Sequence, residues 1–357
     1  MNCHQCAQHA HHRKSDYSRQ TVLPEVGEAG QRRLESSRVL VVGAGGLGSP
    51  VLAYLAGAGI GRIGIVEPDR LDASNLHRQF IYRTEDLGTL KAERAAQWVH
   101  EYNPHVKLTV YPEPIEKLDL AAVLKSYDIV VECTDCMQTK LHVSRACVST
   151  GTPGVFGGIY QYEGQVQVVL PSNDSSCLEC LWTPDTQAPS CAQAGVLGPV
   201  PGVVGSIQAL EVIRQLLGLP GRLRNQVLVI NLHDYSFRKI QLNRNPACPA
   251  HRPQSSTAGS AQAPLDVQIT DLSEFAAYTV VDIRTVQEVM DRPLHIPSTH
   301  IPMDQIVECP ELIDPHTPTL FICAAGVRTR GLAHYLRSRG YSQVYSLQGG
   351  VYASRFV

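Results

Sequence analysis

The sequence predicts an α/β protein, with a doubly wound, largely parallel sheet in a larger domain and a second, smaller α/β domain behind it. Three observations lead to this prediction. Apolar, β-branched runs alternate with amphipathic segments from residue 39 to about residue 170, which is typical of parallel strands joined by helices. The first of these runs enters a glycine-rich turn at Gly43. A stretch of linker-type residues then separates residues 265–357 from the rest.

The apolar runs place the individual elements. In the larger domain, strands are expected over 39–42, 63–66, 107–111 and 128–133, with helices over 26–36, 50–58, 90–101 and 120–125. A longer amphipathic helix is expected over 203–217, followed by strands over 226–232 and 237–242. In the smaller domain, strands are expected over 279–283, 319–323 and 343–346, and a helix over 330–339. A ligand of the larger sheet should lie beyond the carboxyl ends of its parallel strands.

Composition divides the chain and limits its function. Residues 1–14 are expected to be a disordered tail, 15–251 and 265–357 the two domains, and 252–264 a flexible linker. The net charge of −2 favours neither nucleic acid nor a membrane surface as a partner. The chain has neither a membrane-spanning apolar run nor a signal-peptide core, so the expected location is the cytoplasm. The cysteines number 11, which suits metal-binding or catalytic thiols in a reducing compartment.

The glycine turn, Gly43-Ala44-Gly45-Gly46-Leu47-Gly48, has the spacing of a phosphate cradle. Glycines let the backbone approach a phosphate, and the N–H groups of the following helix face the anion. Ser49 and Pro50 are expected to cap and begin that helix. By itself the turn does not distinguish a dinucleotide from a triphosphate.

Charged residues near the ends of the same strands favour a triphosphate. Glu67 follows the second strand, where it could hold ribose hydroxyls. Acidic Asp69 and Asp135, together with basic Arg78 and Lys91, gather at the same edge of the predicted sheet. This combination suits a nucleoside triphosphate with a magnesium ion.

Three groups of thiols are candidates for chemistry. Cys177-x2-Cys180 and Cys248-x2-His251 together supply a closed tetrahedral set for a structural zinc ion. Cys191 lies in a polar, proline-rich segment expected to be a mobile loop. Cys323 ends a strand and is followed by a glycine-containing loop, Arg328 and a helix. Such a loop surrounds the sulfur with N–H groups and a positive helix end, which stabilises a thiolate.

Six motifs occur in the order found in one enzyme family: Ser18-Arg19-Gln20, the glycine turn, Ser74-Asn75-Leu76-His77-Arg78-Gln79, Cys133-Thr134-Asp135, Cys177-Leu178-Glu179-Cys180 and Cys191-Ala192-Gln193-Ala194-Gly195-Val196. Residues 15–251 closely resemble the E1-like adenylyltransferases of the molybdopterin-synthase and thiamin sulfur-carrier type, which have a Rossmann-like fold. The resemblance implies an ATP site formed by Arg19, Gly45, Gly46, Glu67, Ser74, Asn75, Arg78, Lys91, Asp135 and Cys136, with magnesium held by Asp135. It also implies a homodimer in which Arg19 reaches the neighbouring subunit's nucleotide site.

The resemblance gives Cys191 a role and also shows departures from the family pattern. It implies that Cys191 takes the activated acyl group or relays sulfur. Cys136 stands where the family usually has Asn, Leu90 where Pro is common, and Lys140 where Arg is usual. A thiol cannot reproduce the donor and acceptor pair of an amide.

Residues 265–357 resemble a rhodanese. The resemblance rests on Val281-Asp282-Ile283-Arg284, His300-Ile301-Pro302-Met303, the Cys323 loop and Gly349-Gly350-Val351. It implies that Cys323 carries a persulfide, with Arg328 as the cation of its loop. Ala324 stands where relatives often have a polar side chain.

Together the two resemblances imply one reaction sequence. The larger domain adenylylates the C-terminal Gly-Gly of a small ubiquitin-like sulfur carrier, and Cys323 then delivers sulfur to form a thiocarboxylate. The sulfur is expected from a cysteine desulfurase or from a small donor. Two alternatives stay open at this point. One is a nicotinamide-dependent oxidoreductase, which would leave the zinc ligands and the rhodanese unexplained. The other is an adenylyltransferase whose second domain only docks a desulfurase.

Overall fold

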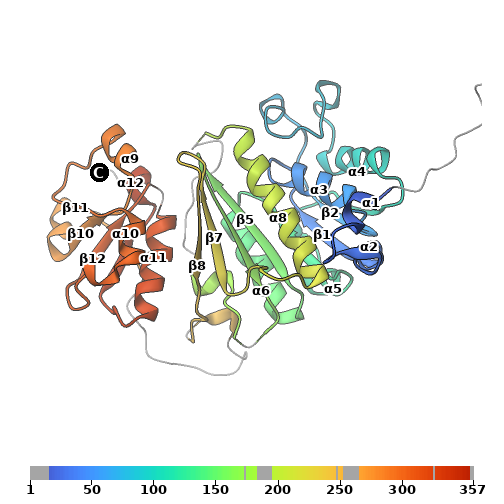
Figure 1. Cartoon of the computed structure of the whole chain (residues 1–357). Helices are drawn as coiled ribbons and strands as arrows, with labels where there is room; N and C mark the ends of the chain where they lie inside the picture. Colours follow the sequence, from blue (N-terminus) through green and yellow to red (C-terminus); the bar gives the residue numbers. More distant parts are fainter. Residues whose placement is uncertain are drawn as a thin grey trace, which may run out of the picture.

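The computed structural model describes residues 16–172, 174–182, 195–246, 248–251, 265–324 and 326–353. These residues form two sheets, one of eight strands and one of five. Figure 1 shows the eight-stranded sheet and its helices in blue to yellow, and the smaller unit beside it in orange and red. The predicted fold class is confirmed: a large, mainly parallel α/β sheet and a second, smaller α/β unit.

One half of the larger sheet is parallel. Its strands are β1 (Arg38–Val42), β2 (Arg62–Val66), β3 (Lys107–Tyr111), β4 (Ile129–Glu132) and β5 (Gly154–Tyr160). They lie in the order β3-β2-β1-β4-β5. The direction of winding reverses between β1 and β4, and the carboxyl ends of these two strands form the crevice where such sheets bind ligands.

Helices cover both faces of this sheet, and the alternation of side chains along β1 explains why. Val39 and Val41 pack in one core with helices α3 (Gly48–Gly57), α4 (Lys91–Tyr102) and α8 (Pro199–Leu217). Leu40 and Val42 point to the opposite face and pack with α5 (Leu120–Leu124) and α6 (Met137–Thr150). Because successive side chains of a strand point to opposite faces, a strand that is apolar at every position must be covered on both. The short α1 (Ser18–Thr21) and α2 (Gly27–Ser36) precede β1.

The other half of the sheet is antiparallel. Here β5 pairs with β6 (Glu163–Val169), and β7 (Gln226–Asn231) and β8 (Ser236–Gln241) complete the sheet. The sequence did not predict β5, β6 or α6. Glycines interrupt β5, and one of them is required by packing: a Cβ on Gly157 would lie 2.3 Å from the Gln208 side chain of α8. Close approach of a helix therefore explains a composition that does not look like a strand.

The helix after the glycine turn begins differently from the prediction. It starts at Gly48, and Leu47, at the N-cap position, makes no side-chain capping hydrogen bond. Ser49 lies inside the first turn, where its hydroxyl donates to the Gly45 carbonyl over 2.8 Å. The predicted cap at Ser49 was therefore wrong. Its hydroxyl instead donates to a backbone carbonyl of the turn, that of Gly45.

The smaller sheet is entirely parallel, in the order β11-β10-β12-β13-β9. Its strands are β9 (Asp266–Val267), β10 (Thr279–Asp282), β11 (Thr299–His300), β12 (Thr319–Ile322) and β13 (Val344–Leu347). Its helices are α9 (Val286–Asp291), α10 (Met303–Glu308), α11 (Val327–Ser338) and α12 (Gly350–Ala353). Helix α11 begins at Val327 and not at the predicted residue 330, so Arg328 lies in its first turn.

The two units are in contact through α11 and the outer strand β8 (Figure 1). Met303 and Tyr335 of the smaller unit pack against a core cluster of the larger one. At the rim, Arg238 of β8 pairs with Asp304 over 3.0 Å. Within the described residues, no helix is both long enough and apolar enough to cross a membrane.

Candidate active site

A cavity of about 430 Å³ lies at the carboxyl ends of the parallel strands, and both units line it. The larger unit contributes the glycine turn and the residues that follow β2 and β4. The smaller unit contributes Met303, Cys323, Arg328 and Gly331. The predicted nucleotide site and the predicted sulfur-transfer cysteine therefore open onto one space.

The glycine turn depends on its glycines at two points. Gly43 has a φ of +91°, in a region that side chains disfavour. A Cβ on Gly48 would lie 2.1 Å from the Gly43 carbonyl oxygen, which no adjustment of a side chain can relieve. Gly45 and Gly46 line the cavity. The turn is thus closed tightly enough that the backbone itself faces the ligand space.

Glu67 ties the turn to the end of β2. Its two carboxylate oxygens accept hydrogen bonds from the Ala44 N–H over 2.8 Å and the Asp69 N–H over 2.9 Å. The side chain is buried. Burial raises the pKa of Glu67, while the Ala44 N–H and the nearby Lys91 ammonium act in the opposite direction. The carboxylate therefore has a structural task at the turn besides facing the cavity.

The predicted basic residues lie around the same space. Lys91 is the first residue of α4, and its buried ammonium lies 3.3 Å from Asp69 Oδ2. Arg78 donates from Nη1 to the Ser74 carbonyl over 2.8 Å. Arg78, Lys91 and Asn75 line the cavity, and Ser74 does not. Two cations at the mouth of a glycine turn are suited to neutralise phosphate charge.

The segment after β4 carries Asp135 and Cys136, which are exposed and line the cavity. Lys140, which also lines the cavity, anchors this segment. Its ammonium pairs with the buried Glu132 and donates to the carbonyls of Thr134 over 2.7 Å and Gly157 over 2.6 Å. Sequence reasoning noted Lys140 only as a departure from a family pattern. Nothing in the sequence around Lys140 indicates that its side chain contacts the end of β4.

In the smaller unit, Cys323 follows β12 and is buried. Its sulfur accepts a hydrogen bond from the Gly326 N–H over 3.1 Å and lies 3.5 Å from Thr329 Oγ1. Gly326 has a φ of +79°, which turns the chain into α11. The structure thus places a backbone N–H, that of Gly326, and the start of α11 beside the sulfur.

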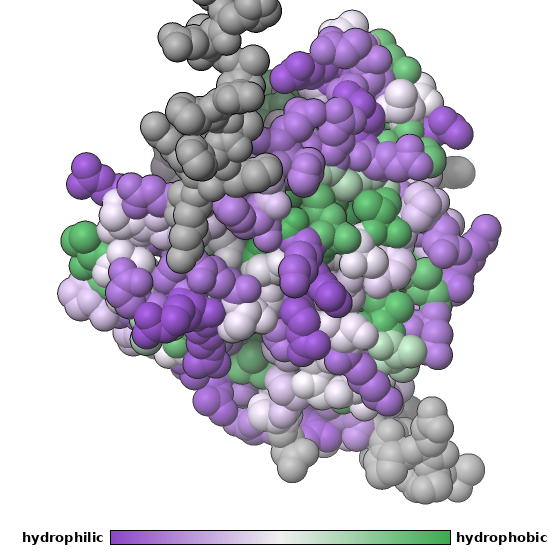
Figure 2. Space-filling model, turned by 90° about the vertical axis from the view of Figure 1, so that its right-hand side faces the viewer, coloured by the Kyte–Doolittle hydropathy of each residue, from purple (hydrophilic) through white to green (hydrophobic). Residues whose placement is uncertain are grey.

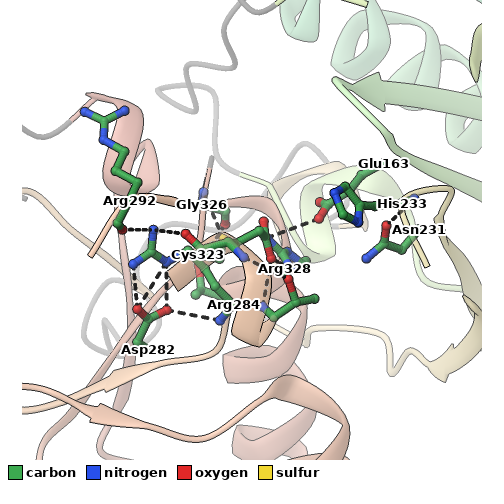
Figure 3. Close-up of polar contacts among 12 residues, drawn as sticks. Glu163, Asn231, His233, Asp282, Arg284, Arg292, Cys323, Gly326 and Arg328 are labelled. Carbon is green, nitrogen blue, oxygen red and sulfur yellow. Dashed lines mark hydrogen bonds and ion pairs between the residues drawn. The ribbon is translucent and has the colours of Figure 1, made fainter. Parts of the chain in front are cut away.

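Buried ion pairs surround the Cys323 loop (Figure 3). Arg328 donates to both carboxylate oxygens of Glu288, over 3.0 and 2.5 Å, and also lies 3.1 Å from Glu163 of β6. Burial disfavours the charged guanidinium, but these carboxylates hold the pKa of Arg328 above its ordinary value. Below the loop, Arg284 forms a buried pair with Asp282, 2.7 Å apart. Sequence reasoning missed Glu163, because no local pattern connects it to the Cys323 loop.

The predicted metal ligands also come together. The ligand atoms of Cys177, Cys180, Cys248 and His251 all lie within 4.8 Å of one another. The three cysteines are buried, and the buried Nε2 of His251 has no hydrogen-bond partner among the described residues. A set of three thiols and one imidazole in this arrangement fits a tetrahedral metal ion. None of the four lines the cavity, so the site is separate from the candidate active site.

One other predicted residue is described by the structure and lies outside the cavity. Arg19 is exposed on α1 and does not line it. Cys191 lies outside the described residues, as do the tail over residues 1–14 and the linker over 252–264. Their predicted roles are therefore expectations from sequence.

The ThiF family model matches residues 17–250, and the rhodanese-like domain model matches residues 265–354. The chain belongs to the ThiF family. A ThiF domain followed by a rhodanese-like domain makes it an enzyme with an adenylyltransferase and a sulfurtransferase part. This assignment decides against the nicotinamide-dependent oxidoreductase, which was the first alternative from the sequence.

Curated relatives agree with the ThiF assignment, and a solved structure agrees with the fold. The chain is 45% identical over 240 residues to the "Sulfur carrier protein adenylyltransferase" of Thermus thermophilus, covering 65% of this chain and 89% of the relative. It is 32% identical over 362 residues to "Probable adenylyltransferase/sulfurtransferase MoeZ" of Mycobacterium tuberculosis, covering 94% and 91%. A crystal structure of E. coli MccB with MccA-N7isoASN superposes with a TM-score of 0.58 at 22% identity, covering 66% of this chain and 74% of that one. This last likeness is evidence for the fold alone.

Proposed function

We propose that this enzyme uses ATP to adenylylate the C-terminal Gly-Gly of a ubiquitin-like sulfur carrier and then converts that end to a thiocarboxylate. The observation that carries the proposal is the shared cavity, which is lined by the glycine turn of one unit and by Cys323 of the other. This reaction requires contact between the activated acyl group and the sulfur of Cys323, and a cavity lined by both units allows that contact. The relative from Thermus thermophilus is named for activity on a sulfur carrier protein.

In the first step, a carboxylate oxygen of the carrier attacks the α-phosphorus of ATP, and pyrophosphate leaves. The backbone N–H groups at Gly45 and Gly46 face the phosphates, while Arg78 and Lys91 offset their negative charge. Asp135 presents an exposed carboxylate on the same cavity, which is the type of ligand that magnesium prefers. When bound there, the ion would neutralise phosphate charge and favour departure of pyrophosphate.

In the second step, the terminal sulfur of a Cys323 persulfide attacks the acyl carbon, and the bond to AMP breaks. This leaves an acyl disulfide between the carrier and Cys323. The Cys191 thiolate then attacks Cys323 Sγ and releases the thiocarboxylate, leaving a Cys191–Cys323 disulfide that a thiol reductant must reopen. A cysteine desulfurase is the proposed source of the persulfide sulfur. The Gly326 N–H, which donates to the Cys323 sulfur over 3.1 Å, supports the proposed role of this sulfur in the transfer step.

The remaining parts of the proposal concern the metal and the assembly. The set of Cys177, Cys180, Cys248 and His251 is proposed to hold a structural zinc ion. The enzyme is proposed to act as a cytoplasmic homodimer in which Arg19 reaches the partner's nucleotide site. Figure 2 supports a contact surface, because apolar side chains gather near the centre of the face that lies at the right of Figure 1. Val22 and Leu23, which follow α1, are 76% and 53% exposed.

The test is to incubate the enzyme with ATP, a sulfur source and a carrier ending in Gly-Gly, and to measure the mass of the carrier. We expect a shift corresponding to one sulfur in place of one oxygen. Cys323→Ala should abolish this shift and retain ATP–pyrophosphate exchange, whereas Cys309→Ala, at an exposed cysteine of the same unit, should change neither. If Cys323→Ala forms thiocarboxylate at the wild-type rate, the second domain is only a docking module for a desulfurase.

A further inference from the structure

An ion pair between the two units is built into the interface beside Cys323. Arg328 Nη2 lies 3.1 Å from Glu163 Oε1, and the side chains are only 8% and 20% exposed. Glu163 is the first residue of β6, and Arg328 lies in the first turn of α11. Figure 3 shows the Glu163 carboxylate pointing at the Arg328 guanidinium across the gap between the units. The contact therefore joins the larger unit directly to the Cys323 loop.

The surroundings of Glu163 make this pair sensitive to geometry. Burial raises the pKa of Glu163 to about 7, Arg328 opposes the rise, and the acidic Glu288 and Asp234 add to it. His233, in the turn between β7 and β8, lies beside Glu163 in Figure 3. Because the value of about 7 already includes the effect of Arg328, the Glu163 carboxyl is about half charged at pH 7, and the ion pair is complete only above that pH. Burying such a pair adds little net stability. Without the Glu163 charge, Arg328 keeps its two hydrogen bonds to Glu288, so what Glu163 adds is the link from the Cys323 loop to the larger unit.

Besides this ion pair, the units share one further directed contact, in which His334 Nε2 of α11 lies 3.1 Å from the Asn243 carbonyl oxygen, and several contacts that are less specific. Met303 and Tyr335 contribute apolar packing, which tolerates sliding because it has no preferred direction. Arg330 lies over the Trp182 ring, 5.3 Å from its centroid. The rim pair of Arg238 and Asp304 is 42% and 41% exposed, and such pairs contribute little. Glu163 is the contact that connects the docked position of α11 to the position of Cys323.

We propose that Glu163 is a positioning residue for sulfur transfer, which holds the Cys323 loop over the adenylate cavity of the same chain by pairing with Arg328. The inference rests on the proposed function, because it assumes that Cys323 delivers sulfur to an adenylate in this cavity. Cys323 lies in the loop after β12, and Arg328 lies in the first turn of the helix that follows this loop. Holding the Arg328 guanidinium in place therefore limits the movement of the Cys323 sulfur.

The test compares Glu163→Gln with wild type in the full-length enzyme, because Gln keeps the size of the side chain and removes its charge. Three rates are measured: ATP–pyrophosphate exchange with the carrier, sulfur transfer from thiosulfate to cyanide, and single-turnover thiocarboxylate formation. We expect thiocarboxylate formation to fall at least about tenfold, because the ion pair that aligns the two units is lost and a small misplacement of reacting groups is costly. ATP–pyrophosphate exchange should stay within about twofold, since it uses the larger unit only. Sulfur transfer from thiosulfate to cyanide needs no alignment of the two units and should fall less than thiocarboxylate formation. Glu163→Asp should restore part of the loss, and Asp304→Asn, at the exposed rim pair, is the matched control.

A pH profile separates positioning from general damage to the fold. With a pKa near 7, Glu163 is protonated as the pH falls through 7, and its pairing with Arg328 is lost. The wild-type rate of thiocarboxylate formation should therefore drop over this range, and Glu163→Gln should lack that drop. Equal rates and profiles in the two proteins would overturn the inference. Absence of thiocarboxylate from the wild-type enzyme would instead overturn the proposed function, so the two failures can be told apart.

Discussion

The glycine turn of the larger unit and the Cys323 loop of the smaller unit have the same plan but are held by different forces. Each follows a parallel strand, contains a glycine with positive φ and leads into a helix. The glycine turn is held by close backbone packing, with the Gly48 position directly against the Gly43 carbonyl. The Cys323 loop is held by buried charges, chiefly Arg328 between Glu288 and Glu163. The glycine turn should therefore be sensitive to added atoms, and the Cys323 loop to lost charges.

The largest expected effect comes from adding one methyl group to the glycine turn. Gly48→Ala would place a Cβ 2.1 Å from the Gly43 oxygen, so the turn must open. We expect ATP–pyrophosphate exchange to fall about a hundredfold, corresponding to about 3 kcal/mol. Gly202→Ala is the matched control, because a Cβ at Gly202 in α8 meets nothing within 4 Å. If Gly48→Ala retains exchange, close backbone packing does not hold the turn.

The next effect tests the charges beneath the Cys323 loop. Asp282 and Arg284 are 2% and 3% exposed, and Asp282→Asn would leave the guanidinium without its partner charge. We expect a loss of about 3 kcal/mol in the free energy of unfolding of the smaller unit, measured by denaturant titration. Asp304→Asn, whose side chain is 41% exposed, should stay within about 0.5 kcal/mol of wild type. A similar small change in both variants would contradict the role given to buried charge.

The smallest expected effect concerns Glu67, a buried carboxylate that accepts a hydrogen bond from the glycine turn. Burial raises the pKa of Glu67, so its carboxylate is protonated at a higher pH than an ordinary glutamate. The protonated acid accepts more weakly from the Ala44 N–H and is a poorer partner for ribose hydroxyls. The KM for ATP should therefore rise about twofold as the pH is lowered from neutrality towards 5, since a weakened hydrogen bond is worth a few tenths of a kcal/mol or more. Glu67→Gln should have a higher KM that does not depend on pH in this range.

The elements that the sequence predicted well are those with a clear local pattern. The strands β1, β2 and β4 are apolar at nearly every position, and α4 and α8 are amphipathic, so their bounds were within a few residues. The sequence missed β5, whose glycines make room for Gln208, and α6, whose many short polar and thiol side chains obscure its buried face. In each case a neighbouring element, and not the local pattern, determines which residues fit.

The sequence by itself determined which groups of this enzyme are equipped for chemistry. The glycine turn and the Cys323 loop are each recognisable from residues close together in the chain, because their geometry is local. The four predicted metal ligands are recognisable as two short pairs, Cys177 with Cys180 and Cys248 with His251, which the fold brings together. Only the tertiary structure decided that Cys323 shares a cavity with the glycine turn, that Lys140 supports the Asp135 segment and that Glu163 meets Arg328. These contacts join residues far apart in sequence, and they depend on how helix α11 packs against β8. Packing of that kind is set by the complementary surfaces of two folded units, which no short stretch of sequence encodes.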